Sequence, residues 1–246
     1  MALEPETKQK IQLFLIFALA LAGIRTAYIL YERHEANKEP GARAAPPMNP
    51  DYYVTPKKFH AYDLKSAQEI GAQPVWVKEG YRSYYFPYDP ATHHADFAHS
   101  AGMLLPLQKL QIKDVVLDKA KDSGPEKQVM AIFDQEGKPY AFQIGTAQGS
   151  DFRIFADGML FLEDPHELYQ HWPPDVWEAI AKHEVQPGMS EIQVIFSVGV
   201  GLAQSSYDLT TLRYPNGGNP LIVTYDASQR VTSVKSAEKS GVDQPH

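Results

Sequence analysis

Imidazole and carboxylate side chains gather in one short stretch of this chain. The segment DPATHHADFAHS holds Asp89, His93, His94, Asp96 and His99 within 11 residues. Side chains of these types bind zinc and other transition metals. Their spacing matches no known ligand signature, such as two histidines on consecutive helical turns, so an exposed polar loop is the competing interpretation. The metal hypothesis names His93, His94, Asp96 and His99 as ligands of a membrane-anchored metal-binding protein or metallohydrolase.

A second concentration of side chains is aromatic. Ten rings lie between Tyr52 and Tyr88, more than one pair of strands can bury. Tyrosine and tryptophan supply contact area at little cost in rotamer entropy and are enriched at protein interfaces. Because β-sheets also favour aromatic residues, packing of a sheet is the alternative. The partner-binding surface that this pattern predicts consists of Trp76, Tyr81, Tyr84, Tyr85, Phe86 and Tyr88.

Other catalytic arrangements are missing from the sequence. No serine stands in a G-x-S-x-G elbow, and there is no glycine-rich phosphate loop or dinucleotide fingerprint. The chain has no cysteine, which excludes disulfides, thiolate metal sites and cysteine nucleophiles. We therefore expect a non-enzymatic protein without a cofactor, apart from the transition metal of the competing hypothesis.

The charge balance is acidic. The chain has 23 Lys+Arg against 30 Asp+Glu, a formal net charge of −7, and no long basic block. Binding nucleic acid regardless of its sequence requires a basic face that displaces counterions. We expect no nucleic-acid partner.

The strongest local signal is an apolar run over residues 11–31, interrupted only by Gln12, Arg25 and Thr26. As a helix, 21 residues rise about 31 Å, enough to cross the hydrocarbon core of a bilayer. The alternative is a cleaved signal peptide, because small residues at Ala20 and Ala22 fit a cleavage site. We expect a single-pass protein of the bacterial inner membrane, with the lipid bilayer contacted through residues 11–31 and the body in the periplasm.

A polar stretch rich in Pro and Ala follows the apolar run, and after it come short β-prone runs separated by turn signals. The clearest hairpin is QVMAIFDQEGKPYAFQIG, in which Gly137 can adopt the positive φ of a tight turn. The segment PVWVKEGYRSYYFPY likewise reads as two strands around Glu79 and Gly80. This part of the chain resembles a bacterial SH3-like barrel.

The pattern changes after Pro173. Pro173 and Pro174 mark where one helix can begin, and Ser190 with Gln193 forms a capping box for a second. Three β-prone runs follow, at residues 207–214, 221–226 and 230–236. The expected order is two helices and then three strands.

That order, together with the turn into the second helix, resembles the SmpA/OmlA-type (BamE-like) family, the small subunit of the outer-membrane barrel-assembly machinery. The residues that carry the resemblance in the turn are Val185, Gly188, Met189, Ser190 and Val194. Those in the sheet are Leu221, Val223, Tyr225, Val231 and Val234. Where the family has Gly-x-Pro after the helix this chain has GVGLAQSS, and it lacks the family's N-terminal lipid-bearing cysteine. The resemblance implies a scaffold or accessory subunit that binds other membrane or envelope proteins.

These observations predict an α+β chain. It comprises one transmembrane helix, an SH3-like antiparallel β-barrel, and a domain of two helices and a three-stranded antiparallel sheet. The expected parts are a tail (1–10), the membrane helix (11–31), a linker (32–58), the β domain (59–172), the SmpA/OmlA-like domain (173–236) and a disordered tail (237–246).

Overall fold

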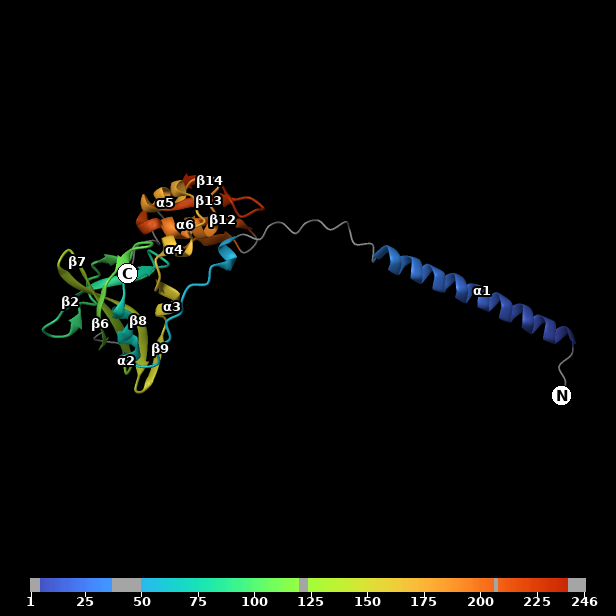
Figure 1. Cartoon of the computed structure of the whole chain (residues 1–246), viewed down its shortest axis with the longest axis horizontal. Helices are drawn as coiled ribbons and strands as arrows, with labels where there is room; N and C mark the ends of the chain where they lie inside the picture. The colour runs from blue at the N-terminus through green and yellow to red at the C-terminus, as the bar shows by residue number, and fades with distance from the viewer. Residues whose placement is uncertain (1–4, 37–49, 120–123, 206–207, 239–246) are drawn as a thin grey trace. The chain divides into compact units, whose positions relative to one another are not determined.

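The computed structural model describes residues 5–36, 50–119, 124–205 and 208–238. The chain divides into two units, residues 1–49 and 50–246 (Figure 1). Residues 37–49 of the expected linker and most of the expected C-terminal tail, residues 239–246, lie outside the described residues. The described part is an α+β structure with several antiparallel sheets, which confirms the coarse fold class.

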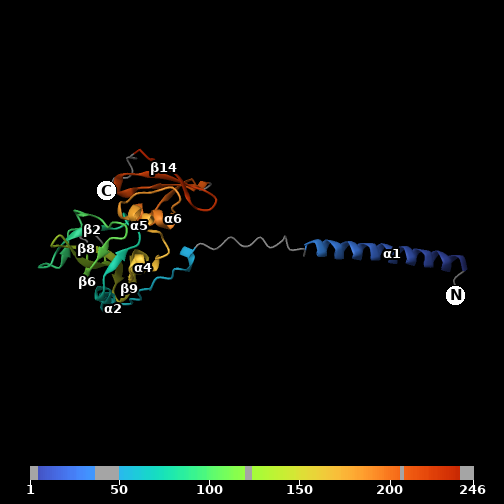
Figure 2. The same cartoon turned by 45° about the horizontal axis from the view of Figure 1, so that its top comes forward.

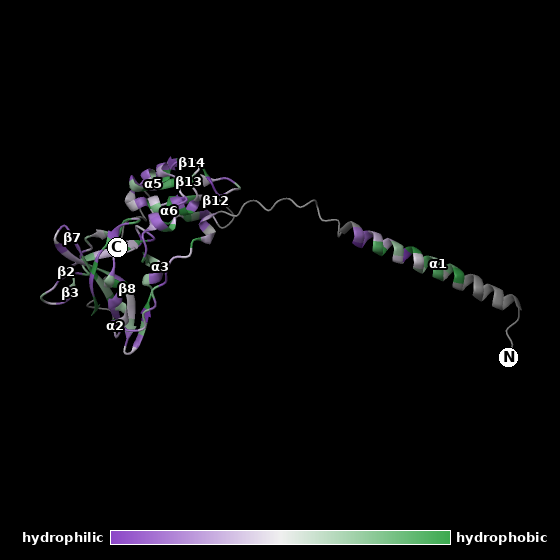
Figure 3. Cartoon of the chain, viewed as in Figure 1, coloured by the Kyte–Doolittle hydropathy of each residue, from purple (hydrophilic) through white to green (hydrophobic). Residues whose placement is uncertain are grey.

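The first unit contains one helix, α1 (Pro5–Ala36). It covers the whole expected span 11–31, begins within the expected tail and continues into the expected linker. Hydrophobic residues fill much of its described middle, and hydrophilic residues lie near Ala36 (Figure 3). Within the described residues, no helix combines the length and the apolar character needed to cross a membrane. This finding gives the expected transmembrane helix no support.

The second unit opens with short helices and then alternates strands with brief helical turns. Its helical elements are η1 (Pro50–Tyr53), α2 (Leu64–Gln68), η2 (Glu69–Ala72), α3 (Ala156–Met159), α4 (Pro165–Leu168), α5 (Pro174–Ala181), α6 (Glu191–Val198) and η3 (Asn216–Gly218). Its first strands are β1 (Val75–Val77), β2 (Tyr84–Asp89), β3 (His94–Ala95), β4 (Gly102–Met103), β5 (Lys109–Leu110), β6 (Ile112–Asp118), β7 (Lys127–Gln135) and β8 (Lys138–Gln148). The remaining strands are β9 (Asp151–Ile154), β10 (Leu160–Phe161), β11 (Leu202–Ser205), β12 (Asp208–Tyr214), β13 (Leu221–Tyr225) and β14 (Val231–Ser236).

The largest sheet has seven antiparallel strands and curls into a half-barrel (Figure 1). Its strand order is β3-β2-β8-β7-β6, with β4 beside β2 and β9 beside β8. The hairpin β7–β8 closes through Glu136 and Gly137, whose φ angles of 53° and 75° give the two left-handed residues of a tight hairpin turn. The hairpin expected from the sequence is thereby confirmed.

A small sheet of order β10-β1-β5 forms a wall shared by two hydrophobic clusters. Successive residues of a strand point to opposite faces. Val75 and Val77 accordingly pack in the first cluster, which runs from Ala67 to Leu160, whereas Trp76 packs against the second. In β10, Leu160 is buried in the first cluster and its neighbour Phe161 in the second. The expected domain boundary at residues 172 and 173 stays a prediction.

The C-terminal sheet has the order β11-β12-β13-β14, and α5 and α6 lie along one side of it (Figure 2). The predicted helix starts are confirmed: α5 begins at Pro174, and the backbone N–H of Ser190 donates to Gln193 Oε1 at 2.8 Å in the capping box of α6. Gly199 ends α6 with a φ of 83°. Side chains of both helices and of the sheet build the second cluster, among them Ile180, Val194 and Val223.

Three expectations need correction. The sheet after the helices has four strands, because β11 forms within GVGLAQSS; all four of its residues are exposed, so no alternation marks it in the sequence. The strands around Glu79 and Gly80 do not form a hairpin, since β1 and β2 belong to different sheets. Residues 50–58 of the expected linker are packed onto the body: Val54 contacts the second cluster, and the Lys57 N–H donates to Glu163 Oε2 at 2.9 Å.

Candidate functional site

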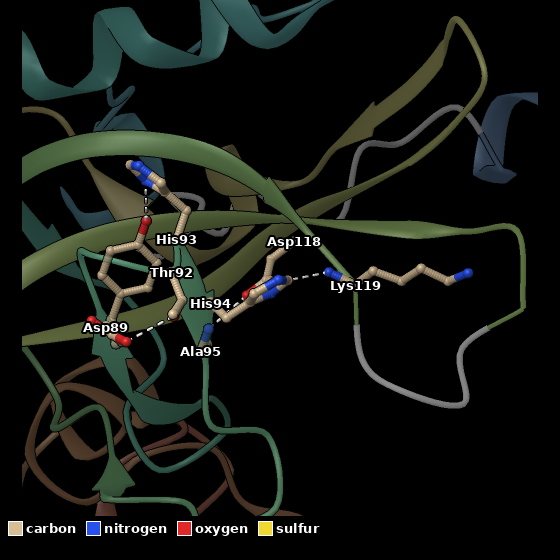
Figure 4. A network of polar contacts seen from close by, with 8 residues as sticks. Asp89, Thr92, His93, His94, Ala95, Asp118 and Lys119 are labelled. Atoms are coloured by element: carbon tan, nitrogen blue, oxygen red, sulfur yellow. Dashed lines mark hydrogen bonds and ion pairs between the residues drawn. The ribbon is translucent and has the colours of Figure 1, made fainter.

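The histidine-rich segment, residues 89–100, runs from the end of β2 through the short strand β3 toward β4 and is tied to the end of β6 by Asp118 (Figure 4). His94 Nδ1 lies 2.6 Å from Asp118 Oδ1. The Asp118 carboxylate is fully buried and also accepts from the backbone N–H groups of Ala95 at 2.7 Å and Lys119 at 2.6 Å. The His94 ring is 64% exposed. Asp118 therefore fixes the loop and the orientation of this imidazole.

The other two histidines of the loop have partners of their own. His93 Nδ1 lies 3.3 Å from the Tyr88 hydroxyl, and His99 Nδ1 lies 2.9 Å from Asp96 Oδ2. Within the described residues no three His, Asp or Glu side chains are arranged to hold a metal ion. Of the proposed ligands, the structure brings only Asp96 and His99 together, as one pair, whereas His93 and His94 bond to other residues, so the four are not gathered at one point.

A buried tyrosine, Tyr88 of β2, lies next to this segment. Burial raises the pKa of Tyr88, and the negative charges of Asp114, Asp118 and Asp89 raise it further. The carboxylate of the neighbouring Asp89 accepts hydrogen bonds from the Ala91 N–H and the Thr92 hydroxyl, which lower its pKa (Figure 4). Hydrogen bonds to Asp89 and Asp118 thus hold this segment at the end of the sheet.

Four of the six aromatic residues expected to bind a partner contribute to packing. Trp76 contacts the second cluster and carries Lys109 Nζ at 5.1 Å from its ring centroid. Tyr85 packs edge-on against Phe133 and Tyr140 in the first cluster. The remaining two of these four, Phe86 and Tyr88, belong to a third hydrophobic cluster on the opposite face of the large sheet.

Tyr81 packs the segment between β1 and β2 against the backbone at Gly199 and Gly217. Its φ of 59° is unusual for a residue other than glycine, and its N–H donates to Leu104 O at 2.7 Å. A methyl group added at Gly217 would come within 2.7 Å of the Tyr81 ring, and one at Gly199 within 2.6 Å of Gly80 O. Burial raises the pKa of Tyr81. This close fit is the physical reason why residues 79–83 cross between two sheets instead of turning a hairpin.

Three hollows adjoin at Arg82, and we call them together the Arg82 groove. The first, of about 390 Å³, has apolar walls from Val77, Leu104, Phe155 and Met159. The second, of about 210 Å³, lies between Tyr81 and the apolar side chains of Val198, Val200 and Leu202. The third, of about 240 Å³, shares Arg82, Ser83, Phe155 and Met159 with the first and adds Tyr84, Phe86 and Gln143.

The rim of the Arg82 groove exposes apolar surface beside one charged pair. Phe155 is 42% and Leu202 60% exposed. Arg82 Nη1 donates to Glu79 Oε2 at 2.7 Å, which holds the guanidinium in place at the point where the hollows meet. The groove therefore combines apolar sockets with an oriented cation.

A polar cluster around Asp51 was not expected from the sequence. Asp51, in η1, accepts from His171 Nε2 and from the Trp172 indole N–H, both at 2.6 Å, and from the Ser190 hydroxyl at 3.4 Å. Its side chain is 6% exposed. Burial, together with the charge of Asp51, raises the pKa of Tyr169 to about 12. No local pattern could have revealed this cluster, because its partners lie 120 or more residues away.

Ser190, His171 and Asp51 do not form a catalytic triad. The hydroxyl of Ser190 donates directly to the carboxylate, whereas nucleophilic catalysis requires the histidine to lie between serine and aspartate. The cluster instead connects the chain at Pro50 to the start of α6. Its role is structural.

Comparison of this chain with protein-family models, with curated proteins and with solved structures found no match.

Proposed function

We propose that this chain is a non-enzymatic scaffold or accessory subunit that binds another protein of the cell envelope through the Arg82 groove. The observation that carries the proposal is the meeting of three hollows at one oriented arginine. Concave, largely apolar sites with a few placed polar groups are the usual form of binding sites. Tyr81, Tyr84 and Phe86, three of the six residues expected to contact a partner, line the groove.

The proposal includes a fold family and a location. The order α5, α6 and then a sheet is that of the SmpA/OmlA-type family, and the curled seven-stranded sheet is compatible with an SH3-like barrel. The apolar run 11–31 would tether the body to the inner membrane, with the body in the periplasm. A tether raises the effective concentration of the body near a membrane partner without adding a contact.

Site-specific photocrosslinking in the native membrane tests the proposal. A photoreactive amino acid replaces Tyr84, a half-buried residue of the groove, in the tagged full-length chain. Tyr62, which is 77% exposed and outside the groove, is the matched control position. We expect one protein to be crosslinked from position 84, identified by mass spectrometry, and none from position 62. Equal products from both positions, or no product from either, would overturn the proposal.

A substitution in the groove gives the second arm of this test. Replacing Phe155 with serine removes an exposed apolar side chain shared by two of the hollows. We expect recovery of the crosslinked partner to fall severalfold while the thermal unfolding midpoint changes little. Unchanged recovery would show that the partner binds elsewhere.

A further inference from the structure

The shape and chemistry of the Arg82 groove indicate what kind of segment it accepts. We infer that its occupant is an extended segment of a partner protein in which an acidic residue is flanked on both sides by apolar residues. This inference rests on the proposed function, because it specifies the ligand of the same groove. The acidic side chain would bind Arg82 and the apolar side chains would enter the hollows.

The unused hydrogen-bonding capacity of Arg82 supports an acidic ligand group. A guanidinium has five N–H donors in a rigid fork, and only Nη1 has a protein acceptor among the described residues, Glu79 Oε2. Glu79 binds one edge of the guanidinium and leaves Nε and Nη2 for a second acceptor. A carboxylate matches such a fork with two parallel hydrogen bonds. The side chain of Arg82 is 62% exposed, so an incoming group can reach it.

Two hollows with largely apolar linings share Arg82. Leu104, Phe155 and Met159 line the first hollow. Val198 and Leu202 line the second. A ligand that fills both hollows must pass Arg82, because Arg82 is the residue that lines both. This arrangement favours an acidic side chain within the segment over a C-terminal carboxylate, which would end the chain at Arg82 and leave one hollow empty.

The charge of the body sets the balance between the two kinds of contact. Residues 51–246 contain 17 Lys+Arg against 25 Asp+Glu, so an acidic segment meets net repulsion at long range. Exposed ion pairs add little to affinity by themselves. The apolar side chains must therefore supply most of the binding, and the contact with Arg82 selects the segment.

A random-peptide library tests the inference directly. The immobilised full-length chain in detergent selects from 12-residue random peptides displayed on phage, and enriched peptides are synthesised with amidated C-termini. We expect the enriched sequences to share an acidic residue with apolar residues on both sides. Replacing that acidic residue with its amide should weaken binding about fivefold, the upper end of the range for a partly exposed ion pair.

Two variants of the chain complete the test. In Arg82→Gln the acidic peptide and its amide should bind equally weakly. In Arg153→Gln, which replaces an arginine that is 80% exposed and outside the groove, the fivefold difference should persist. Thermal unfolding of both variants checks that the fold is intact.

The alternative outcomes separate this inference from the proposed function. Enriched peptides without an acidic residue, with a basic residue in its place, or with unchanged affinity for Arg82→Gln would overturn the inference. If those peptides still lose affinity for Phe155→Ser, the groove remains a binding site. Failure to enrich any peptide would overturn the inference, and the crosslinking experiment then decides the proposed function separately.

Discussion

Asp51 and Asp118 are two buried carboxylates that each accept a hydrogen bond from a histidine at 2.6 Å, but they connect very different parts of the chain. The partners of Asp118 are His94, Ala95 and Lys119, within 24 residues of it. The partners of Asp51 are His171, Trp172 and Ser190, at separations of 120 to 139 residues. Asp118 therefore holds one loop against one strand end, whereas Asp51 joins the start of the second unit to its C-terminal half.

The exposure of the paired histidines differs in the same sense. His94 is 64% exposed beside Asp118, whereas His171 is 31% exposed beside Asp51. When a buried carboxylate is removed, water cannot reach the buried donors that it leaves without an acceptor. Its removal therefore lowers stability strongly. The comparison indicates that chemically similar pairs stabilise the fold to different extents according to what they connect.

Replacing Asp51 with alanine has the largest expected effect. We expect the free energy of unfolding to fall by about 3 kcal/mol, because the buried Trp172 indole N–H and His171 lose their acceptor together. Denaturant unfolding followed by tryptophan fluorescence measures this loss. Asp51→Asn, which keeps one acceptor oxygen, should lose about half as much.

Asp151 provides the matched control for that prediction. It is 70% exposed, and its nearest ion-pair contact, Arg153 Nε, is 3.8 Å away. Asp151→Ala should lower the free energy of unfolding by less than about 0.5 kcal/mol. If Asp51→Ala proved as mild as this control, the proposed connection through Asp51 would be wrong.

Replacing Asp118 with alanine should have a smaller and more local effect. We expect a loss of about 1.5 kcal/mol, because the exposed His94 and Lys119 can exchange their bond to Asp118 for water and only the buried Ala95 N–H is left without an acceptor. Hydrogen exchange should accelerate at residues 93–97 and 119 while the rest of the second unit keeps its protection. Uniform acceleration throughout the unit would show that Asp118 also supports the global fold.

The sequence predicts the elements that depend on neighbouring residues. Gly137 marks the β7–β8 turn, Pro174 opens α5, and Ser190 with Gln193 opens α6; in each case the determining contacts span only a few residues. The histidine loop is also visible in the sequence as a cluster of side chains. Its partner Asp118 is not, because strand pairing brings it there.

The remainder depends on contacts between distant residues. Nothing near Tyr81 shows that Gly199 and Gly217 leave room for its ring, so residues 79–83 resemble an ordinary turn. Arg82 resembles any exposed arginine until the hollows that it lines are known. Asp51 stands beside a Pro-rich stretch that predicts a spacer, and its partners follow 120 residues later.

The smallest predicted effect concerns the tyrosines near the two aspartates. Burial and the charge of Asp51 raise the pKa of Tyr169 to about 12, above its ordinary value of 10. Between pH 10 and 12 the unfolded chain loses this proton while the folded chain keeps it, so the stability that the neutral hydroxyl contributes is complete below pH 10 and is lost as the pH rises toward 12. At pH 11 the loss should be about 1 kcal/mol, and Tyr169→Phe should abolish it.

Tyr88→Phe should reduce the loss of stability at alkaline pH by less, because the Tyr88 hydroxyl contacts the exposed His93, where water also has access. Denaturant midpoints measured from pH 9 to 11.5 for the two variants and the parent chain give the comparison, and equal flattening by both variants would show that the two aspartates have equivalent environments.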